Sequence, residues 1–361
     1  MERIVMTMPI KPQKNTNIGM FIAPAIMNTL SEMFECKGIM ATNLLNTYKN
    51  KDDDLQIYID DLEKQGIKYT ELFVDKYNSD KILEVITRLV YDGYVTKERE
   101  TIYRCQCGKV DILNHGISNV GLGKLYFENE GNYYCSECKS LCIPSIEEVL
   151  VLNLPNNIDD SLLIVPTFLK NDANHLSKTF KGSKLLVSKL RETGYQLNID
   201  GKVFNIDIDF IWMNYFQLFS EKQKIMLASN HQTLQMYLLN YLNRISRNDE
   251  ICFVANPYMN NCTEFDPSQE LNKTSDEFYK KLFILYNLKW RKKNCDWSKS
   301  VIDYLSTISN TRRQNLYKTI LLSKNQFDQN MPIDEYIENI LITGTNMQKN
   351  IVDAKKLVKK P

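Results

Sequence analysis

The sequence predicts an α/β fold built on a parallel sheet, with a small cysteine-rich insertion and a helical C-terminal region. Strand-like and helix-like segments alternate over the first 100 residues, four closely spaced cysteines follow, and helical periodicity dominates from Thr274 onward. A chain of 361 residues can bury a sizeable core. Its 43% hydrophobic and 25% charged residues are typical of an ordinary folded protein.

The N-terminal elements alternate in a regular order. Strands are predicted at 3–10, 38–45, 69–74 and 93–98, with helices at 18–34, 53–64 and 80–91 between them. Pro24 is expected to disturb the interior of the first helix. The alternation indicates crossover units and a parallel sheet. The turn after the first strand should then face a ligand, because open parallel sheets bind ligands at the carboxyl ends of their strands.

The rest of the chain divides into three further regions. Residues 145–154 and 183–197 suggest helix or mixed structure; strands are expected at 202–210, 224–229 and 250–256, a helix at 232–245, and C-terminal helices at 275–290, 297–309, 312–322 and 333–342. The predicted domains are 1–102 and 144–265 for two halves of one sheet, 103–143 for the insertion, and 266–361 for a helical domain. The parallel sheet is therefore expected to resume after an interruption.

Cysteine usage favours a reducing, cytoplasmic location. The nine cysteines are odd in number, the chain is long, and no secretory signal precedes them. Lys11 and Lys14 before the ten-residue apolar run from Ile18 to Met27 superficially imitate a leader peptide. No small-residue cleavage site follows that run and a strand precedes it, so targeting is not expected. No apolar run reaches the length of about twenty residues that a membrane span requires.

Charge is distributed unevenly along the chain. The net charge is only +1, but residues 273–361 contain 17 Lys and Arg against 9 Asp and Glu, a net of +8, which leaves about −7 on the preceding residues. A basic C-terminal region on a weakly acidic body is typical of a polyanion-binding appendage. The alternative is a solvated lysine-rich surface in a chain that is rich in Asn, Ile, Lys and Tyr throughout.

The strongest chemical signal is a pair of closely spaced cysteine motifs. Cys105 and Cys107 form a CxC pair, and after 27 further residues Cys135 and Cys138 form a CxxC pair. Two tight turns that each present two thiolates would complete the tetrahedral shell of a zinc ion. Such a zinc would be structural, because no coordination position stays open, and it would fold a module that lacks a core. Buried or redox cysteines are the alternative, and Cys142 could substitute as a ligand.

The order of these elements resembles that of the class I aminoacyl-tRNA synthetases. A strand, a turn and helix, a second such unit, a cysteine module in an insertion, returning strands and a basic helical tail follow one another over roughly residues 1–320. The likeness is to the methionyl, leucyl, isoleucyl and valyl enzymes, and especially to the methionyl ones. It implies a Rossmann-like catalytic domain that uses ATP to activate an amino acid as its adenylate.

The first signature of this family, His-Ile-Gly-His, falls at the turn after the first strand. Asn17, Ile18, Gly19 and Met20 occupy its four places, in a stretch that Pro12 opens. The resemblance implies a catalytic role for Asn17 and ATP contacts for Pro12, Asn17, Gly19 and Met20. Gly19 allows the nucleotide to approach the backbone closely. Asn17 could donate a hydrogen bond to a phosphate, whereas Met20 cannot, and both histidines of the signature are absent.

Three further stretches match positions of the family. The resemblance places Asp209 beside the amino-acid site, although an alternating strand could also present it to solvent. Asn230 and His231 fall at the turn before the helix at 232–245, where the resemblance implies nucleotide contacts; Asn230 could instead be the helix N-cap. Lys273 in "ELNKTSD" matches the second lysine of the Lys-Met-Ser-Lys-Ser signature, which implies a catalytic and ATP-binding lysine that neutralises phosphate charge.

Three functions agree with the sequence. The first is an enzyme that activates an amino acid with ATP and transfers it to tRNA or a small acceptor. The second is a catalytically impaired protein of the same fold that binds tRNA, an amino acid or a protein partner. The third is an unrelated zinc-bearing nucleic-acid-binding protein, which predicts no nucleotide-sized pocket at the end of the first strand. RNA recognition would rest on the C-terminal cations Lys289, Arg291, Lys292, Lys293, Arg312 and Arg313.

Overall fold

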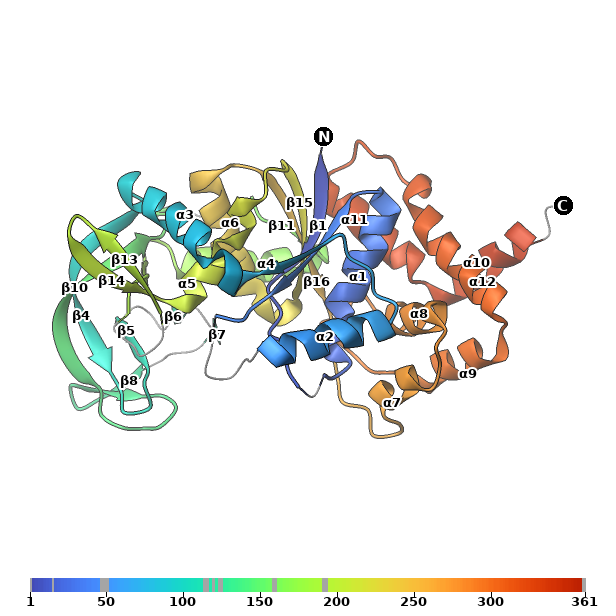
Figure 1. The fold of residues 1–361 in the computed structure, drawn as a ribbon, viewed down its shortest axis with the longest axis horizontal. Helices are drawn as coiled ribbons and strands as arrows, with labels where there is room; N and C mark the ends of the chain where they lie inside the picture. Colours follow the sequence, from blue (N-terminus) through green and yellow to red (C-terminus); the bar gives the residue numbers. More distant parts are fainter. Residues whose placement is uncertain are drawn as a thin grey trace.

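The computed structural model describes residues 2–14, 16–45, 52–112, 117–118, 121–122, 126–157, 161–189 and 194–358. Its parts lie in a row, with antiparallel strands at one end, a parallel sheet in the middle and the C-terminal helices at the other end (Figure 1). Of the helices formed by these residues, none combines the length and the apolar character that crossing a membrane requires.

A six-stranded parallel sheet forms the centre of the molecule, as predicted. Its strands lie in the order β11-β16-β15-β1-β2-β3, and every neighbouring pair is parallel. The strands are β1 (Arg3–Thr7), β2 (Lys37–Thr42), β3 (Glu71–Val74), β11 (Leu163–Val165), β15 (Gln223–Ser229) and β16 (Glu250–Asn256). The chain builds outward from β1 to β3 and later returns on the other side of β1, so the strand order reverses between β1 and β15.

Helices cover both faces of the sheet, because successive residues of its strands are apolar and point to opposite sides. Met6 and Phe253 pack on one face and Val5 and Val254 on the other. The first face carries α3 (Ser79–Tyr91), α4 (Lys170–Thr179), α5 (Ile208–Met213) and α6 (Thr233–Ser246). The second carries α1 (Gly19–Phe34), α2 (Asp52–Lys64), α7 (Pro267–Asn272), α8 (Glu277–Asn287), α9 (Lys299–Thr307), α10 (Asn310–Leu321), α11 (Ile333–Gly344) and α12 (Met347–Val358). The predicted C-terminal helices are confirmed, and they share one core with α1 (Figure 1).

Pro24 lies inside α1 without ending it. In a regular helix the N–H of residue 24 would donate to the carbonyl of Met20, and proline has no N–H to do so. The buried hydroxyl of Tyr58, on α2, donates to the Met20 carbonyl instead, at 3.1 Å. The Tyr58 ring also stacks on Phe21, with 6.5 Å between centroids. A donor from a neighbouring helix thus replaces the missing backbone bond, and α1 continues past Pro24 to Phe34.

The insertion is carried by an antiparallel sheet that the sequence analysis predicted only in part. Its strands β4 (Val95–Arg104), β5 (Val110–Ile112), β10 (Ile143–Asn153) and β12 (Lys184–Leu186) lie in the order β12-β10-β4-β5. Two predictions were wrong here. Residues 145–154, expected to be helical or mixed, lie mostly in β10, and the strand expected at 93–98 belongs to this sheet rather than to the parallel one. The hairpin β8 (Tyr126–Asn129) and β9 (Asn132–Cys135) extends from this sheet; β6 (Ile117–Ser118) and β7 (Gly121–Leu122) form a further pair.

The segment before β15 also differs from its prediction. Residues 183–197 contain β12 and the start of β13 (Tyr195–Ile199), which pairs with β14 (Lys202–Ile206) in an antiparallel hairpin. The strand predicted at 202–210 therefore ends at Ile206. Asp207 stops it, because its carboxylate accepts a hydrogen bond from the Asp209 N–H at 2.9 Å and caps α5. A last short pair joins β17 (Tyr258–Met259) to β18 (Asn294–Cys295) in parallel.

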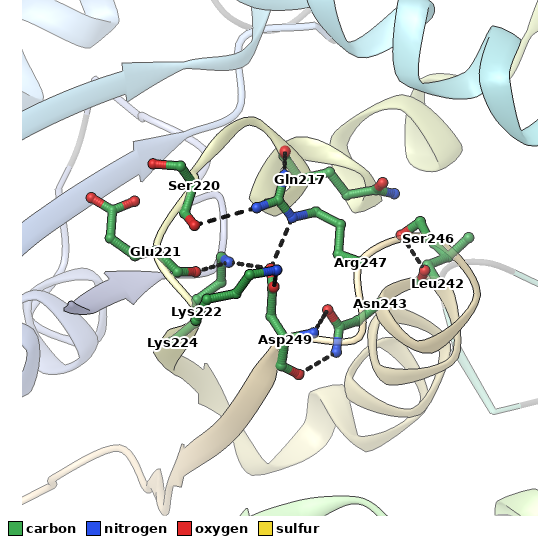
Figure 2. A network of polar contacts seen from close by, with 10 residues as sticks. All are labelled: Gln217, Ser220, Glu221, Lys222, Lys224, Leu242, Asn243, Ser246, Arg247 and Asp249. Atoms are coloured by element: carbon green, nitrogen blue, oxygen red, sulfur yellow. Dashed lines mark hydrogen bonds and ion pairs between the residues drawn. The ribbon is translucent and has the colours of Figure 1, made fainter. Parts of the chain in front are cut away.

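A buried carboxylate joins β15, β16 and α6 at the edge of the sheet away from the strands' carboxyl ends. Figure 2 shows Asp249 surrounded by cations: its oxygens lie 2.6 Å from Nζ of the fully buried Lys224, 2.8 Å from Nζ of Lys222 and 2.8 Å from Nε of Arg247. Its backbone exchanges hydrogen bonds with the Asn243 amide. Burial opposes ionisation of Asp249, but the hydrogen bonds from the three cations outweigh it and hold its pKa below the usual value.

We predict that Asp249→Asn lowers the free energy of unfolding by about 3–5 kcal/mol, because it leaves the buried Lys224 ammonium without a counter-ion. Urea denaturation at pH 7 measures this. Asp200→Asn is the matched control, since the Asp200–Lys97 pair is exposed and should contribute less than about 1 kcal/mol. An equal effect of the two substitutions would contradict the prediction.

The same contact predicts a pH dependence. The pKa of Asp249 is lowered on folding, so its stabilisation is present above the ordinary value of 3.8 and is lost as the pH falls through the lowered folded-state value. The difference in unfolding free energy between the native protein and Asp249→Asn should therefore shrink below about pH 4. A constant difference from pH 7 to pH 3 would contradict this assignment.

We predict that Tyr58→Phe costs about 1–3 kcal/mol of unfolding free energy, because it leaves the Met20 carbonyl unpaired. In a Pro24→Ala background the same substitution should cost less, since position 24 then supplies the missing backbone N–H. Chemical denaturation of the four proteins of this double-mutant cycle measures the coupling. Strict additivity would show that the hydroxyl does not compensate for the proline.

Candidate functional site

The sheet holds a cavity at the place where its strand order reverses. This first cavity, of about 430 Å³, opens at the carboxyl ends of β1, β15 and β16. Its lining includes Met8, Pro9, Ile10, Lys11, Gln13, Asn17, Gly19, Met20, Ser229, Gln232, Asn256, Tyr258 and Met259. Such a switch point is where open α/β sheets bind ligands, and the volume lies in the range of about 300–1,000 Å³ typical of small-molecule sites. The cavity contradicts the third function, which predicted no pocket at the end of the first strand.

The N-terminus of α1 forms one wall of the first cavity. Asn17, Gly19 and Met20 all line it, as the sequence predicts for three of the residues that match the first signature. Ile18, the N-cap, offers no side-chain hydrogen bond to the first turn, which also contains no acidic residue. An uncapped helix N-terminus of this kind favours an anion. A Cβ at Gly19 would lie 3.0 Å from Oδ1 of Asn17, so glycine lets Asn17 lie close against the helix.

A second cavity adjoins the first. It measures about 860 Å³ and also contacts Asn17, Gly19, Tyr258 and Met259. Its other lining residues come mainly from the segment after β17 and from the start of α7, and include Asn260, Cys262, Phe265, Asp266 and Ser268; Trp297, which follows β18, also lines it. The two cavities therefore lie on either side of the turn that begins α1. A ligand longer than the first cavity could extend across this turn.

The turn after β15 is ordered by residues next to the predicted ones. Ser229 caps the turn and forms a capping box with Gln232, whose side chain accepts from the Ser229 N–H at 2.8 Å. Asn230 is therefore not the N-cap. Its amide donates to the Lys293 carbonyl, and its Oδ1 is buried without a hydrogen-bond partner among the described residues. His231 lies edge-on to Tyr258, with 4.9 Å between ring centroids.

Sequence reasoning missed several residues of the first cavity. Ser229 and Gln232 line it, whereas the predicted Asn230 and His231 do not appear in its described lining. The Ser-x-x-Gln spacing after a strand is a capping-box signature and was the signal available. Tyr258, two residues beyond β16, lines both cavities and was missed as well. Its position just past a strand end was the only indication.

Three other predicted residues lie apart from the lining described for both cavities. Lys273 follows α7 with a side chain that is 68% exposed, and its Nζ lies 2.7 Å from Oε2 of Glu270. Asp209 lies in the first turn of α5, where it accepts a hydrogen bond from Trp212 at 3.3 Å. Pro12 is buried between the lining residues Lys11 and Gln13. Their assigned roles stay predictions.

The four predicted cysteines meet in one cluster, which could form a zinc module. All four Sγ atoms lie within 4.8 Å of one another, with Cys105 at 2.9 Å from Cys138 and Cys107 at 3.7 Å from Cys135. Four sulfurs at about 2.3 Å from a tetrahedral zinc would be about 3.8 Å apart, so the donor set suits that ion. Cys142 is buried nearby but does not belong to the cluster.

Two tight turns present these thiols. In the first, the Gly108 N–H donates to the Cys105 carbonyl at 3.0 Å, and Gly108 adopts a φ of +84°, which glycine tolerates. In the second, the Lys139 N–H donates to the Cys135 carbonyl at 3.0 Å. The strand ends of β4 and β9 hold the turns opposite each other. The backbone thus brings the four thiols together in one cluster.

We predict that the protein binds one equivalent of zinc and that Cys135→Ser abolishes this binding, because three sulfurs do not close the tetrahedral shell. Zinc content after gel filtration, measured by atomic emission, tests this. Cys36→Ser is the control, and Cys142→Ala should keep the zinc, since Cys142 lies outside the cluster. Loss of zinc from Cys142→Ala would show that this residue is a ligand.

Comparisons with known proteins agree with the fold. No protein-family model matches the chain, and no curated protein matches it. Among solved structures, methionyl-tRNA synthetase of Mycobacterium tuberculosis in complex with methionyl-adenylate matches with a TM-score of 0.64 and 10% identity, over 92% of this chain and 73% of that one. The apo form of that enzyme matches with a TM-score of 0.62 and 11% identity, over 100% and 82%. The chain therefore shares the fold of methionyl-tRNA synthetase.

Proposed function

We propose that the protein binds ATP and an amino acid in the first cavity and joins them as an aminoacyl-adenylate. The observation that carries this proposal is the cavity itself, at the strand reversal and against the N-terminus of α1. A similar fold, that of methionyl-tRNA synthetase, has been solved with methionyl-adenylate. In the reaction the amino-acid carboxylate would attack the α-phosphorus of ATP, the bond to the β-phosphate oxygen would break, and pyrophosphate would leave.

The residues at the start of α1 would bind the nucleotide. The uncapped first turn of α1 would stabilise negative charge on the phosphates. Asn17 would donate a hydrogen bond from its amide, and Gly19 would let the nucleotide approach the backbone. To act at the phosphates, the Lys273 ammonium would have to leave the Glu270 carboxylate and bind the phosphates instead. The adenylate would then pass its aminoacyl group to tRNA or to a small acceptor.

The apolar part of the lining would receive the amino-acid side chain. Met8, Ile10, Ile22, Ala23 and Leu227 contribute this part, and Lys11 is the one charged residue in the described lining. A charged amino-acid side chain would be surrounded mostly by these apolar residues, which offer it no counter-ion. An uncharged amino acid is therefore the proposed substrate class.

A catalytically impaired protein of the same fold is the second candidate. Asn17 and Met20 stand where the resembling enzymes have histidines, and the Lys273 ammonium is paired with Glu270 away from both cavities. Removing one preorganised donor from a catalytic site can cost about 10²–10³ in rate. Nucleotide binding would survive such a loss, because the helix N-terminus and the cavity remain.

A nucleic-acid partner would meet the exposed cations of the C-terminal region. Lys289, Arg291 and Lys292 are exposed. Arg313 instead supports the fold, since it pairs with Asp276 at 2.6 Å and donates to the carbonyls of Leu305 and Ile308. The segment before α9, rather than the helices that follow, would therefore make the contacts with tRNA.

We predict ATP–pyrophosphate exchange that depends on an uncharged amino acid, and exchange slower by about 10²-fold in Asn17→Ala, because one preorganised phosphate donor is lost. A panel of the twenty amino acids with radiolabelled pyrophosphate measures this. Asn171→Ala, on the exposed face of α4, is the matched control and should exchange at the native rate.

The outcomes separate the two candidates. Absence of exchange with every amino acid, together with measurable ATP binding by calorimetry, would support the impaired protein and exclude the enzyme. Absence of both exchange and ATP binding would exclude both. If Asn17→Ala exchanges at the native rate, the proposed activity stands, but Asn17 has no role in it.

A further inference from the structure

The first cavity contains a cation that the family resemblance does not predict. Lys11 lies on the segment that leaves β1, and among the described lining residues it alone is charged. The second cavity has one charged lining residue, Asp266, which is occupied in capping α7 through the N–H groups of Ser268 and Gln269. We call the two cavities together the cleft. A ligand anion in the cleft would therefore contact Lys11 before any other charged residue of the described lining.

A second group of cations is fixed beside the same cleft by backbone pairing. We call residues 289–293 (Lys-Trp-Arg-Lys-Lys) the basic segment. It leads directly into β18, which runs parallel to β17, and the Tyr258 N–H donates to the Lys293 carbonyl at 2.9 Å. The Asn230 amide donates to the same carbonyl. Because Tyr258 lines both cavities, the Lys293 end of the basic segment lies beside them.

Trp290 anchors the basic segment in the core, and the charged residues on either side of it are exposed. Trp290 is 2% exposed and belongs to the core shared by α1 and the C-terminal helices. Lys293 pairs with Asp172 on α4 at 2.6 Å. Lys289, Arg291 and Lys292 are exposed and form no ion pair with the described residues. These three cations thus have no ion-pair partner in the described part of the chain, whereas Lys273 is paired with Glu270.

We propose that Lys11 and the basic segment bind the phosphate groups of the ligand in the cleft, in place of the lysine signature. This inference rests on the proposed function for the nucleotide and extends it to other residues. Phosphate could come from the triphosphate of ATP or from the backbone of an RNA strand that enters the cleft. Lys11 would contact the phosphate deepest in the first cavity, and Arg291 and Lys292 those at the rim.

Calorimetric titrations with ATP and with adenosine separate phosphate contacts from base contacts. Lys11→Gln and the double variant Arg291→Gln/Lys292→Gln should each weaken ATP binding roughly tenfold, because a charge-assisted hydrogen bond is lost, and should leave adenosine binding unchanged. Lys81→Gln, at an exposed position of α3, is the matched control and should change ATP binding less than twofold, and Lys273→Gln tests the lysine signature itself. All these side chains are partly or fully exposed, so the variants should fold, and thermal denaturation checks this.

A single-stranded RNA of twelve nucleotides tests the other source of phosphate. If Arg291 and Lys292 contact its backbone, the double variant should bind it more weakly, and the slope of log K against log salt should become shallower by about 0.7 for each lost contact. Lys11→Gln should have a smaller effect on RNA than on ATP, since Lys11 lies inside the first cavity.

The outcomes also distinguish the inference from the proposed function. Native protein that binds neither ATP nor adenosine would overturn the proposed function, and RNA binding that weakens in the double variant would then still support the basic segment as a phosphate site. ATP binding that is weakened by Lys273→Gln, and not by Lys11→Gln or the double variant, would overturn the inference while the proposed function stands. Equal binding of ATP and adenosine by the native protein, with no effect of the double variant on RNA, would overturn the inference as well.

Discussion

The parallel pairing of β1 with β15 is the constraint on which the rest of the structure depends. It joins Arg3 to Gln223 and Thr7 to Leu227, so the first strand of the chain lies beside a strand formed after the whole insertion. The Tyr215 hydroxyl reinforces this junction by donating to the Thr7 carbonyl at 2.7 Å. Because the strand order reverses at this pair, helices leave in opposite directions and the space between them becomes the first cavity.

The sheet was predictable because its strands are apolar on both faces. The runs in β1, β15 and β16 are short, continuous and bounded by polar turns. This pattern is typical of buried parallel strands rather than of an amphipathic helix. The ribbon β4–β10 was harder to predict, because Glu147 and Glu148 are good helix formers when read alone. Their partners are distant in the sequence: Arg104 on β4 pairs with Glu147, and Lys202 on β14 pairs with Glu148. Such a contact is non-local and cannot be read from a single stretch.

The candidate site was predictable to a similar extent and for related reasons. The turn at Asn17 to Met20 and the cysteine pairs depend on local spacing, which a sequence displays directly. The basic segment depends on distant pairing, since β17 meets β18 across a stretch that contains α7 and α8. For Asp209, the local strand pattern led to a wrong prediction of the secondary structure. Its strand pattern continued past Ile206, but the Asp207 carboxylate accepts a hydrogen bond from the Asp209 N–H and begins a helix.

Pro24 and Tyr58 make one unit although they belong to different helices. A proline at position 24 leaves the Met20 carbonyl dependent on a hydroxyl from α2, and Met20 lines the first cavity. Substitution at either position is thus constrained by the residue at the other: loss of the Tyr58 hydroxyl costs less once the proline has gone, while the buried ring still stacks on Phe21. In an evolutionary record of this chain, the two positions would change together. Two hydrogen bonds tie α2 to the binding turn: the one from Tyr58 to Met20, and the one that the Thr16 hydroxyl donates to Asp61 at 2.7 Å.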